Sequence, residues 1–277
     1  MTELDSFNDK LLEGTSRSFY LTLKRLPKSV KGQIGLLYLL ARISDTIADS
    51  GESGGEDLLE LLEDYNNRAQ GHSNSMPDFS NLSDVQENPA EGLLLRGAHG
   101  PIELLEEASV VDQELIRRCL DIIISGQRMD LERFQDKDGS GIRSLSRYEE
   151  MDDYAYRVAG SVGEFWTEIC LEHAFEASAE LKEELMSSGV RFGKALQLIN
   201  ILRDIPEDLE IGRCYIPTDD LEKIGLSPND LLLPDSIDAF RPLLDQYIAR
   251  AEEHLDEAVR YILSLIHISE PTRRLVI

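Results

Sequence analysis

Two DxxxD pairs on apolar segments are the residues of this chain best suited to chemistry. The first pair is Asp45 and Asp49, and the second is Asp204 and Asp208. Carboxylates four residues apart share one face of a helix. A single DxxxD pair can arise by chance on any acidic helix and then forms a solvated face. Two pairs on apolar helices, each with an arginine close to its first aspartate, predict a cation site instead.

The second pair belongs to a narrow polar stripe. If residues 197–208 form a helix, then Gln197, Asn200, Asp204 and Asp208 fall in one arc of roughly 80°. Apolar residues occupy most of the remaining circumference: Leu196, Leu198, Ile199, Ile201, Leu202 and Ile205. A solvent-facing helix would have a broader polar face. The stripe therefore predicts carboxylates in an enclosed cavity, where they stay ionised only beside a cation.

The first pair has a similar setting. Arg42 lies three residues before Asp45 and on the same helical face, within an arc of about 60°. Apolar residues line the opposite side: Leu37, Leu40, Ala41, Ile43 and Ile47. Magnesium prefers oxygen ligands and binds readily between carboxylates and substrate phosphates. Two facing pairs could thus hold several Mg²⁺ ions and a diphosphate, which would become a leaving group from an allylic carbon. Apolar walls would shelter the resulting carbocation.

Composition agrees with a helical protein that binds no nucleic acid. The 277 residues are 42% hydrophobic and 29% charged, and apolar residues recur mainly three and four positions apart. This spacing favours an all-α fold. The net charge of −25 argues against binding to nucleic acid or anionic lipid. An anionic substrate would therefore need local arginines and metal cations.

The cysteines and the chain termini predict a cytoplasmic location. Cys119, Cys170 and Cys214 are far apart, as expected for reduced thiols in a core. No HExxH motif indicates zinc. The start of the chain has no apolar signal core, and the longest apolar stretch (34–43) is too short to span a bilayer. Any membrane contact would be peripheral, to deliver an insoluble product, and no oligomeric state follows from the sequence.

The elements that must position these residues are predicted as helices. Their ranges are 4–13, 27–49, 58–68, 101–108, 112–134, 146–172, 179–208 and 239–262. Hydroxyls at 15–18 could cap the helix that follows them. Residues 71–92, rich in Ser, Asn, Asp and Pro, are predicted to form an exposed, mobile loop. Gly160 and Gly163 inside a helix indicate close helix packing or room for a ligand.

The last residues do not fit this pattern. Residues 263–273 (LSLIHISEPTR) resemble the translation of a transposase adapter used in sequencing libraries. We therefore expect 1–262 to form the domain and 263–277 to be an artefactual tail that takes no part in the fold. A natural tail is the alternative.

Four motifs resemble the ordered signature of the squalene/phytoene synthase family. They are SRSF (16–19), ARISDTIAD (41–49), YAYRVAGSVG (154–163) and QLINILRDIPEDLEIGRCYIP (197–217). The resemblance runs from about residue 10 to residue 262. It implies a single-domain isoprenoid-synthase bundle of helices around a central cavity, with both Asp-rich helices facing it. TSRSFYLTLKRLP and VAGSVGEFW look most like the bacterial squalene-making branch.

The resemblance also implies roles for individual residues. The Mg²⁺ ligands would be Asp45, Asp49, Asn200, Asp204 and Asp208. The diphosphate and polar substrate contacts would be Ser16, Arg17, Arg42, Gln197, Arg203 and Arg213. Phe19, Val158, Gly160 and Gly163 would line the prenyl pocket, although at this spacing they could equally be core. Tyr154 matches a cavity tyrosine that assists rearrangement or proton transfer, and an ordinary buried tyrosine is the alternative. Asp130 matches a frequent acidic position of the family, but capping or surface pairing explains it nearly as well.

The implied reaction joins two farnesyl diphosphates head to head with two or three Mg²⁺ ions, through a cyclopropyl diphosphate, to squalene. Squalene would require NADPH, and because GxGxxG is absent its site would not be of Rossmann type. The first alternative is phytoene synthase, which uses geranylgeranyl diphosphate and no reductant. The alternative from another class is a non-catalytic acidic helical protein that binds cations or a partner helix. Family members usually continue into C-terminal helices that complete the active site, so we expect this chain to be open at one side and poorly active.

Overall fold

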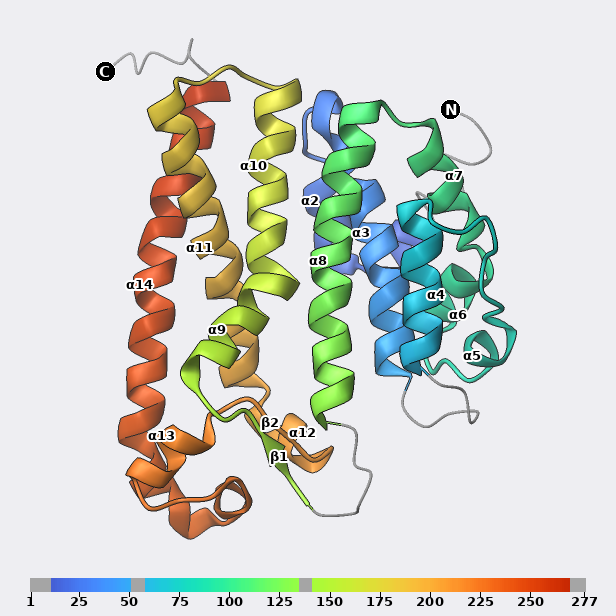
Figure 1. The fold of residues 1–277 in the computed structure, drawn as a ribbon. Helices are drawn as coiled ribbons and strands as arrows, with labels where there is room; N and C mark the ends of the chain where they lie inside the picture. Colours follow the sequence, from blue (N-terminus) through green and yellow to red (C-terminus); the bar gives the residue numbers. More distant parts are fainter. Residues whose placement is uncertain (1–10, 51–57, 135–140, 270–277) are drawn as a thin grey trace. The chain divides into compact units, whose positions relative to one another are not determined.

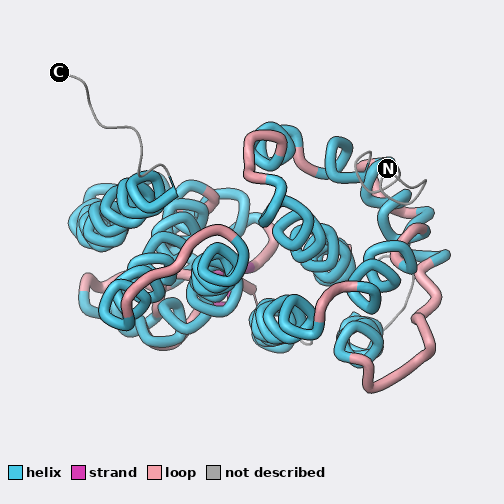
Figure 2. The backbone as a smooth tube through the Cα atoms, turned by 90° about the horizontal axis from the view of Figure 1, so that it is seen from above, coloured by secondary structure: helices cyan, strands magenta, loops and turns pink. Residues whose placement is uncertain are grey.

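The fold is almost entirely helical. A computed structural model describes residues 11–50, 58–134 and 141–269, and helices dominate these ranges (Figure 2). The only strands in them are β1 (Arg143–Ser144) and β2 (Arg213–Cys214), which pair in parallel. The all-α prediction is therefore confirmed. Most of the helix predicted over 4–13, and the last eight residues of the tail predicted over 263–277, lie outside the described residues.

The chain divides into two compact units. Unit 1 comprises Met1–Arg128 and Glu168–Glu176, and unit 2 comprises Met129–Thr167 and Ala177–Ile277. The boundaries fall inside two long helices, α8 (Val110–Phe134) and α10 (Ser161–His173). Each unit has its own buried core and is described by itself below. Every helix in the described ranges is too short or too polar to cross a membrane.

Unit 1 is built on α3 (Lys28–Asp49), which contacts four other helices (Figure 1). They are α2 (Arg17–Leu23), α4 (Leu58–Gln70), α6 (Pro89–Arg96) and α7 (His99–Glu107).

The apolar face of α3 explains this central place. Leu40, Ile43 and Ile47 have no exposed surface, and they lie on the side opposite Arg42 and Asp45. The predicted division of this helix into an apolar and a charged face is therefore confirmed. Since each large apolar side chain gains roughly 1.5–3 kcal/mol on full burial, this face anchors the helix.

The loop predicted over 71–92 is wrong in part. It contains α5 (Ser80–Asp84) and the start of α6, and Phe79 and Leu82 are buried. The side chain of Asn88 caps α6 by accepting a hydrogen bond from the Ala90 N–H at 3.0 Å. Few apolar residues suffice here because they are spaced so that a short helix can bury them.

Unit 2 contains α11 (Ala179–Arg203) and α14 (Ile237–Ser269), which lie side by side (Figure 1). Its shorter helices are α9 (Tyr148–Ala155), α12 (Ile205–Glu210) and α13 (Thr218–Lys223). Two 3₁₀ turns, Pro228–Leu232 and Pro234–Ser236, precede α14. The last helix thus continues past residue 262, where the sequence predicted its end.

The long helix predicted over 146–172 is interrupted. Between α9 and α10 the chain forms a π-helical segment, Tyr156–Gly160. Such bulges occur often at functional sites.

Close backbone packing explains Gly163 of α10 and Gly193 of α11. A Cβ atom at Gly163 would lie 1.9 Å from the carbonyl oxygen of Gly189, and one at Gly193 would lie 2.0 Å from that of Ala159. Only glycine allows helices to approach this closely. Of the two interpretations of the glycine motif, close helix packing is confirmed.

Candidate active site

The first acidic pair lies on the last turns of α3. Arg42 Nη1 is 2.5 Å from Asp45 Oδ2, and its other Nη donates to Glu91. The side chain of Asp45 is 41% exposed, and Asp49 is exposed. Partial burial and the Asp49 carboxylate raise the pKa of Asp45 to about 6, although Arg42 acts in the opposite direction. The protein thus leaves negative charge incompletely compensated here, which favours a bound cation.

Glu91 is a site residue that the sequence reasoning missed. It lies in the first turn of α6 and holds the second half of the Arg42 guanidinium. Arginine forks of this kind fix the orientation of the side chain. Asn88 followed by Pro89 is a typical start of a helix and could have indicated α6, but no local signal reports the pairing of Glu91 with Arg42.

The second acidic pair lies where α11 meets α12. Arg203 binds Asp204 through two parallel contacts, Nε–Oδ1 at 2.6 Å and Nη2–Oδ2 at 2.7 Å. The hydrogen bonds from Arg203 lower the pKa of Asp204. Burial raises the pKa of Asp208 to about 6, against the charge of Arg213. In the second pair, Asp204 is thus held by an arginine, whereas burial disfavours the charged form of Asp208.

The continuous helix predicted over 179–208 is wrong at Asp204. The residue has φ −96° and ψ 11° and separates α11 from α12. Pro206 follows at the start of α12, and because proline has no N–H it cannot continue the ladder of hydrogen bonds. The Asp208 N–H nevertheless donates to the Asp204 carbonyl at 2.9 Å, so the two carboxylates remain one turn apart.

The amides of the polar stripe lie on the last turns of α11. Asn200 Nδ2 is 3.5 Å from Gln197 Oε1, and both residues are half-buried. Leu196 and Ile199 are 48% and 37% exposed. The helix is thus less fully surrounded by apolar contacts than its composition predicted.

A second cluster of unit 2 contains Tyr154, Tyr215, Asp130 and Arg213. The Tyr154 ring stacks on the Tyr215 ring, and the Tyr215 hydroxyl donates to Asp130 Oδ2 at 2.5 Å. Arg213 Nη1 lies 3.5 Å from the same Oδ2. Because Asp130 is buried, surface pairing does not explain it. Tyr215 was missed because nothing local in the sequence separates it from a core aromatic residue.

The residues predicted near the start of α2 have structural partners. Ser16 caps α2 by accepting a hydrogen bond from the Phe19 N–H at 3.2 Å, as the hydroxyls at 15–18 predicted. Phe19 stacks on Tyr38 with ring centroids 4.5 Å apart. The side chain of Arg17 lies outside the described part of the chain, so its predicted diphosphate contact stays a prediction.

Val158 and Gly160 belong to the π-helical segment. Gly160 is buried, and a Cβ atom there would meet Tyr156, Lys194 and Val190 side chains at 3.1–3.4 Å. Gly160 and Gly163 therefore pack against α11, and lining of a prenyl pocket by these residues stays a prediction.

A hollow of about 390 Å³ in unit 2 is lined by residues of α10, α11 and α14, including His254. Arg191 Nε is 3.3 Å from His254 Nδ1, and Lys194 Nζ pairs with Asp152 at 2.7 Å. Burial, together with the charges of Arg191 and Lys194, lowers the pKa of His254.

This shift predicts a pH dependence of stability. The unfolded chain protonates His254 near pH 6.5, and the folded protein does so only at lower pH, so the free energy of unfolding should fall as the pH drops below about 6.5. The melting temperature between pH 7.5 and 5.5 should fall more steeply in the wild type than in His254→Gln. Equal slopes would contradict the assignment.

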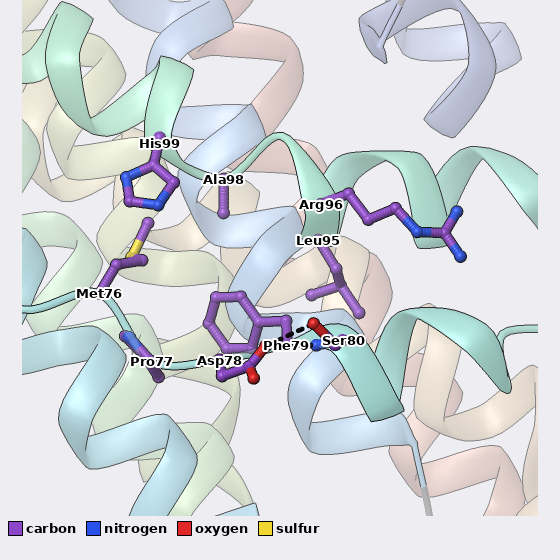
Figure 3. A pocket seen from close by; sticks show the side chains of 9 residues that line it. All are labelled: Met76, Pro77, Asp78, Phe79, Ser80, Leu95, Arg96, Ala98 and His99. Carbon is purple, nitrogen blue, oxygen red and sulfur yellow. Dashed lines mark hydrogen bonds between the residues drawn. The ribbon is translucent and has the colours of Figure 1, made fainter.

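A smaller pocket in unit 1, of about 180 Å³, is shown in Figure 3. Asp78 accepts hydrogen bonds there from the N–H and hydroxyl of Ser80, and Arg96 pairs with Asp84. Its volume is below the ~300 Å³ at which small-molecule sites begin. We assign it no part in the candidate site.

The donor atoms of each acidic pair fit magnesium. Within the described ranges, no three His, Cys, Asp or Glu side chains gather closely enough to hold a metal by themselves. Each pair supplies two carboxylates, and magnesium completes its shell with water and phosphate oxygens. The raised pKa values of Asp45 and Asp208 agree with this donor set.

Comparison with known proteins gives a consistent result. A sequence profile of the squalene/phytoene synthase family matches residues 12–276. A 15-cis-phytoene synthase of Synechocystis is 30% identical over 254 residues, which cover 90% of this chain and 66% of that protein. The chain thus spans just under two thirds of this relative, and 41% of a bifunctional lycopene cyclase/phytoene synthase of Gibberella fujikuroi.

Solved structures agree on the fold. TcSQS bound to a ligand matches with a TM-score of 0.74 and 21% identity, covering 94% of this chain and 71% of that one. A squalene synthase from Alicyclobacillus acidocaldarius matches with a TM-score of 0.62 and 20% identity, covering 94% and 84%.

Proposed function

The chain belongs to the squalene/phytoene synthase family, whose members are prenyltransferases, and we propose that it condenses two prenyl diphosphates head to head with Mg²⁺. The observation that carries the proposal is the paired geometry of the acidic sites. In each unit an arginine is bonded to the first aspartate of a DxxxD pair, and the second unit repeats what the first shows.

In this proposal both acidic pairs bind Mg²⁺ for the substrate diphosphate. Asp45 and Asp49 would supply the ligands of the first pair, and Asp204 and Asp208 those of the second, with Asn200 as a further ligand. Bound Mg²⁺ would withdraw charge from the diphosphate and so make it a leaving group. The net charge of −25 makes such cations necessary for an anionic substrate.

Three arginines would bind the diphosphate oxygens. Arg42, Arg203 and Arg213 each contact a carboxylate in the structure. Magnesium would take over Asp45 and Asp204, and the guanidinium donors of Arg42 and Arg203 would then turn to phosphate, whose geometry matches the fork equally well. The arginines are thus held in place before the substrate arrives.

The carbon chemistry then follows in two stages. One substrate loses diphosphate to give an allylic cation, and the double bond of the other attacks it to form a cyclopropyl diphosphate after loss of a proton. The second diphosphate leaves, and the cation rearranges to the linear chain. Tyr154 would lie beside these cations, where a phenol oxygen and ring face stabilise positive charge.

The substrate is proposed to be farnesyl diphosphate, with geranylgeranyl diphosphate as the second candidate. The bacterial squalene-like motifs support the first, and the 30% identity to a 15-cis-phytoene synthase supports the second. Squalene would require hydride from NADPH, whereas phytoene forms by loss of a proton.

The test is diphosphate release and hydrocarbon extraction after incubation with each substrate, with Mg²⁺ or with EDTA, and with or without NADPH. It is run on this chain and on a version in which the C-terminal segment of the Synechocystis relative replaces residues 263–277. We expect Mg²⁺-dependent release and a thirty- or forty-carbon product. If neither version releases diphosphate, the enzyme proposal fails and a non-catalytic cation-binding protein is favoured.

A further inference from the structure

Tyr215 joins a buried carboxylate to the candidate catalytic tyrosine. Its ring lies 5.0 Å from that of Tyr154, with the planes 24° apart, and the two hydroxyl oxygens are 3.4 Å apart. The same Tyr215 hydroxyl donates to Asp130 Oδ2 at 2.5 Å. The three residues come from separate segments of unit 2, so the fold has brought them together.

A count of protons gives this chain of contacts a direction. A phenol carries one proton, and Tyr215 lies within donating distance of both Asp130 and Tyr154. The carboxylate is the closer and stronger acceptor. In the 3.4 Å contact the Tyr215 hydroxyl is again the donor and the Tyr154 oxygen the acceptor, so Tyr215 is anchored on Asp130 and contacts Tyr154 from there.

Tyr215 is itself held firmly enough to fix the position of its neighbour Tyr154. It is 7% exposed, and Phe134 packs edge-on against its ring at 5.2 Å. The strand just before it is fixed by β1, because the Leu145 N–H donates to the Cys214 carbonyl at 3.2 Å. Burial and the neighbouring Tyr154 and Asp130 raise the pKa of Tyr215 far above its ordinary value, so the hydroxyl keeps its proton.

We propose that Tyr215 is a positioning residue that, anchored by its hydrogen bond to Asp130, fixes the Tyr154 ring through ring stacking and through the contact between the two hydroxyls. This inference rests on the proposed function, in which Tyr154 contacts the carbocations.

The competing explanation is a core tyrosine with a satisfied hydroxyl, and the chain offers a matched control for it. Tyr247 is 1% exposed, lies in the same unit, and donates to Asp220 Oδ2 at 2.5 Å. Tyr215→Phe and Tyr247→Phe therefore remove equivalent tyrosine–aspartate hydrogen bonds and keep both rings. Each should lower the melting temperature by a similar amount.

Turnover separates the two variants. We expect Tyr215→Phe to lower kcat for diphosphate release by about tenfold or more with little change in KM, because only the orientation of a reacting group is lost. Tyr247→Phe should stay within about twofold of the wild type. The double variant Tyr154→Phe/Tyr215→Phe should be no slower than Tyr154→Phe alone, because Tyr215 acts through Tyr154. Equal kcat values for Tyr215→Phe and Tyr247→Phe would overturn the inference.

A second measurement does not depend on turnover. With 3-fluorotyrosine incorporated in place of Tyr154, the ¹⁹F resonance should shift on Tyr215→Phe and stay in place on Tyr247→Phe. If the wild type releases no diphosphate, the proposed function fails, and this resonance alone decides the positioning claim. An unchanged resonance in Tyr215→Phe would refute it.

Discussion

Asp45→Asn is expected to lower the rate of diphosphate release by roughly 10²-fold or more, because a lost metal ligand removes several kcal/mol of charge stabilisation from the transition state. Asp204→Asn should have a similar effect from the second pair. Both residues are carboxylates bonded to an arginine, at 2.5 Å for Asp45 and at 2.6 and 2.7 Å for Asp204. An amide is neutral and binds Mg²⁺ more weakly than a carboxylate does.

Asp45→Asn should lose activity without losing stability. Burial and the Asp49 charge oppose ionisation of Asp45, so removal of the charge relieves repulsion. The melting temperature should therefore stay unchanged or rise, as is common for substitutions in active sites. Mg²⁺ with inorganic diphosphate should raise the melting temperature of the wild type and have less effect on the variant.

Asp121→Asn is the matched control for this experiment. Asp121 lies in the same unit and accepts a hydrogen bond from Asn66 Nδ2 at 2.8 Å, away from both acidic pairs in the sequence. The rate of diphosphate release by Asp121→Asn should stay within about twofold of the wild type. If Asp45→Asn and Asp121→Asn release diphosphate equally fast, Asp45 is no metal ligand.

The parts of the fold that depend on local periodicity could be predicted from the sequence. The opposite faces of α3 follow from residue spacing alone, and Leu40, Ile43 and Ile47 are buried as that spacing requires. The acidic pairs could be found for the same reason, since residues four apart share one helical face. These inferences need no knowledge of what the helix packs against.

The parts that depend on distant contacts could not be predicted. Glu91 reaches Arg42 across 49 positions, and Tyr215 reaches Asp130 across 85. No pattern within a short window reports such pairs. The break at Asp204 was missed for another reason, since Pro206 was outweighed by the strong apolar pattern around it, although proline commonly begins a helix. The hydrogen bond from the Asp208 N–H to the Asp204 carbonyl nevertheless keeps the two carboxylates one turn apart.

The largest effect on stability is expected for Gly163→Ala. A Cβ atom there would lie 1.9 Å from the Gly189 carbonyl oxygen, a separation that real atoms never adopt. Backbone atoms cannot rotate away as a side chain can, so α10 and α11 would have to move apart and disturb the core around them. Overpacking of this kind should cost at least about 3 kcal/mol, against which the better helix propensity of alanine returns no more than about 1 kcal/mol. We expect the melting temperature to fall by roughly 6 °C or more.

Gly189→Ala and Gly32→Ala test the same backbone contact even if Gly163→Ala fails to fold. At Gly189 the nearest atoms to a new Cβ lie at 2.7 Å, so Gly189→Ala should be destabilised less than Gly163→Ala. At Gly32, an exposed position in α3, a Cβ atom meets nothing within 4 Å. Gly32→Ala should therefore raise the free energy of unfolding by about 0.5–1 kcal/mol through helix propensity alone.

Urea unfolding of the three variants should rank their stability as Gly32→Ala, then Gly189→Ala, then Gly163→Ala. If Gly163→Ala were as stable as Gly32→Ala, the two helices would not be in backbone contact, and the glycines of this motif would be explained by room for a ligand instead.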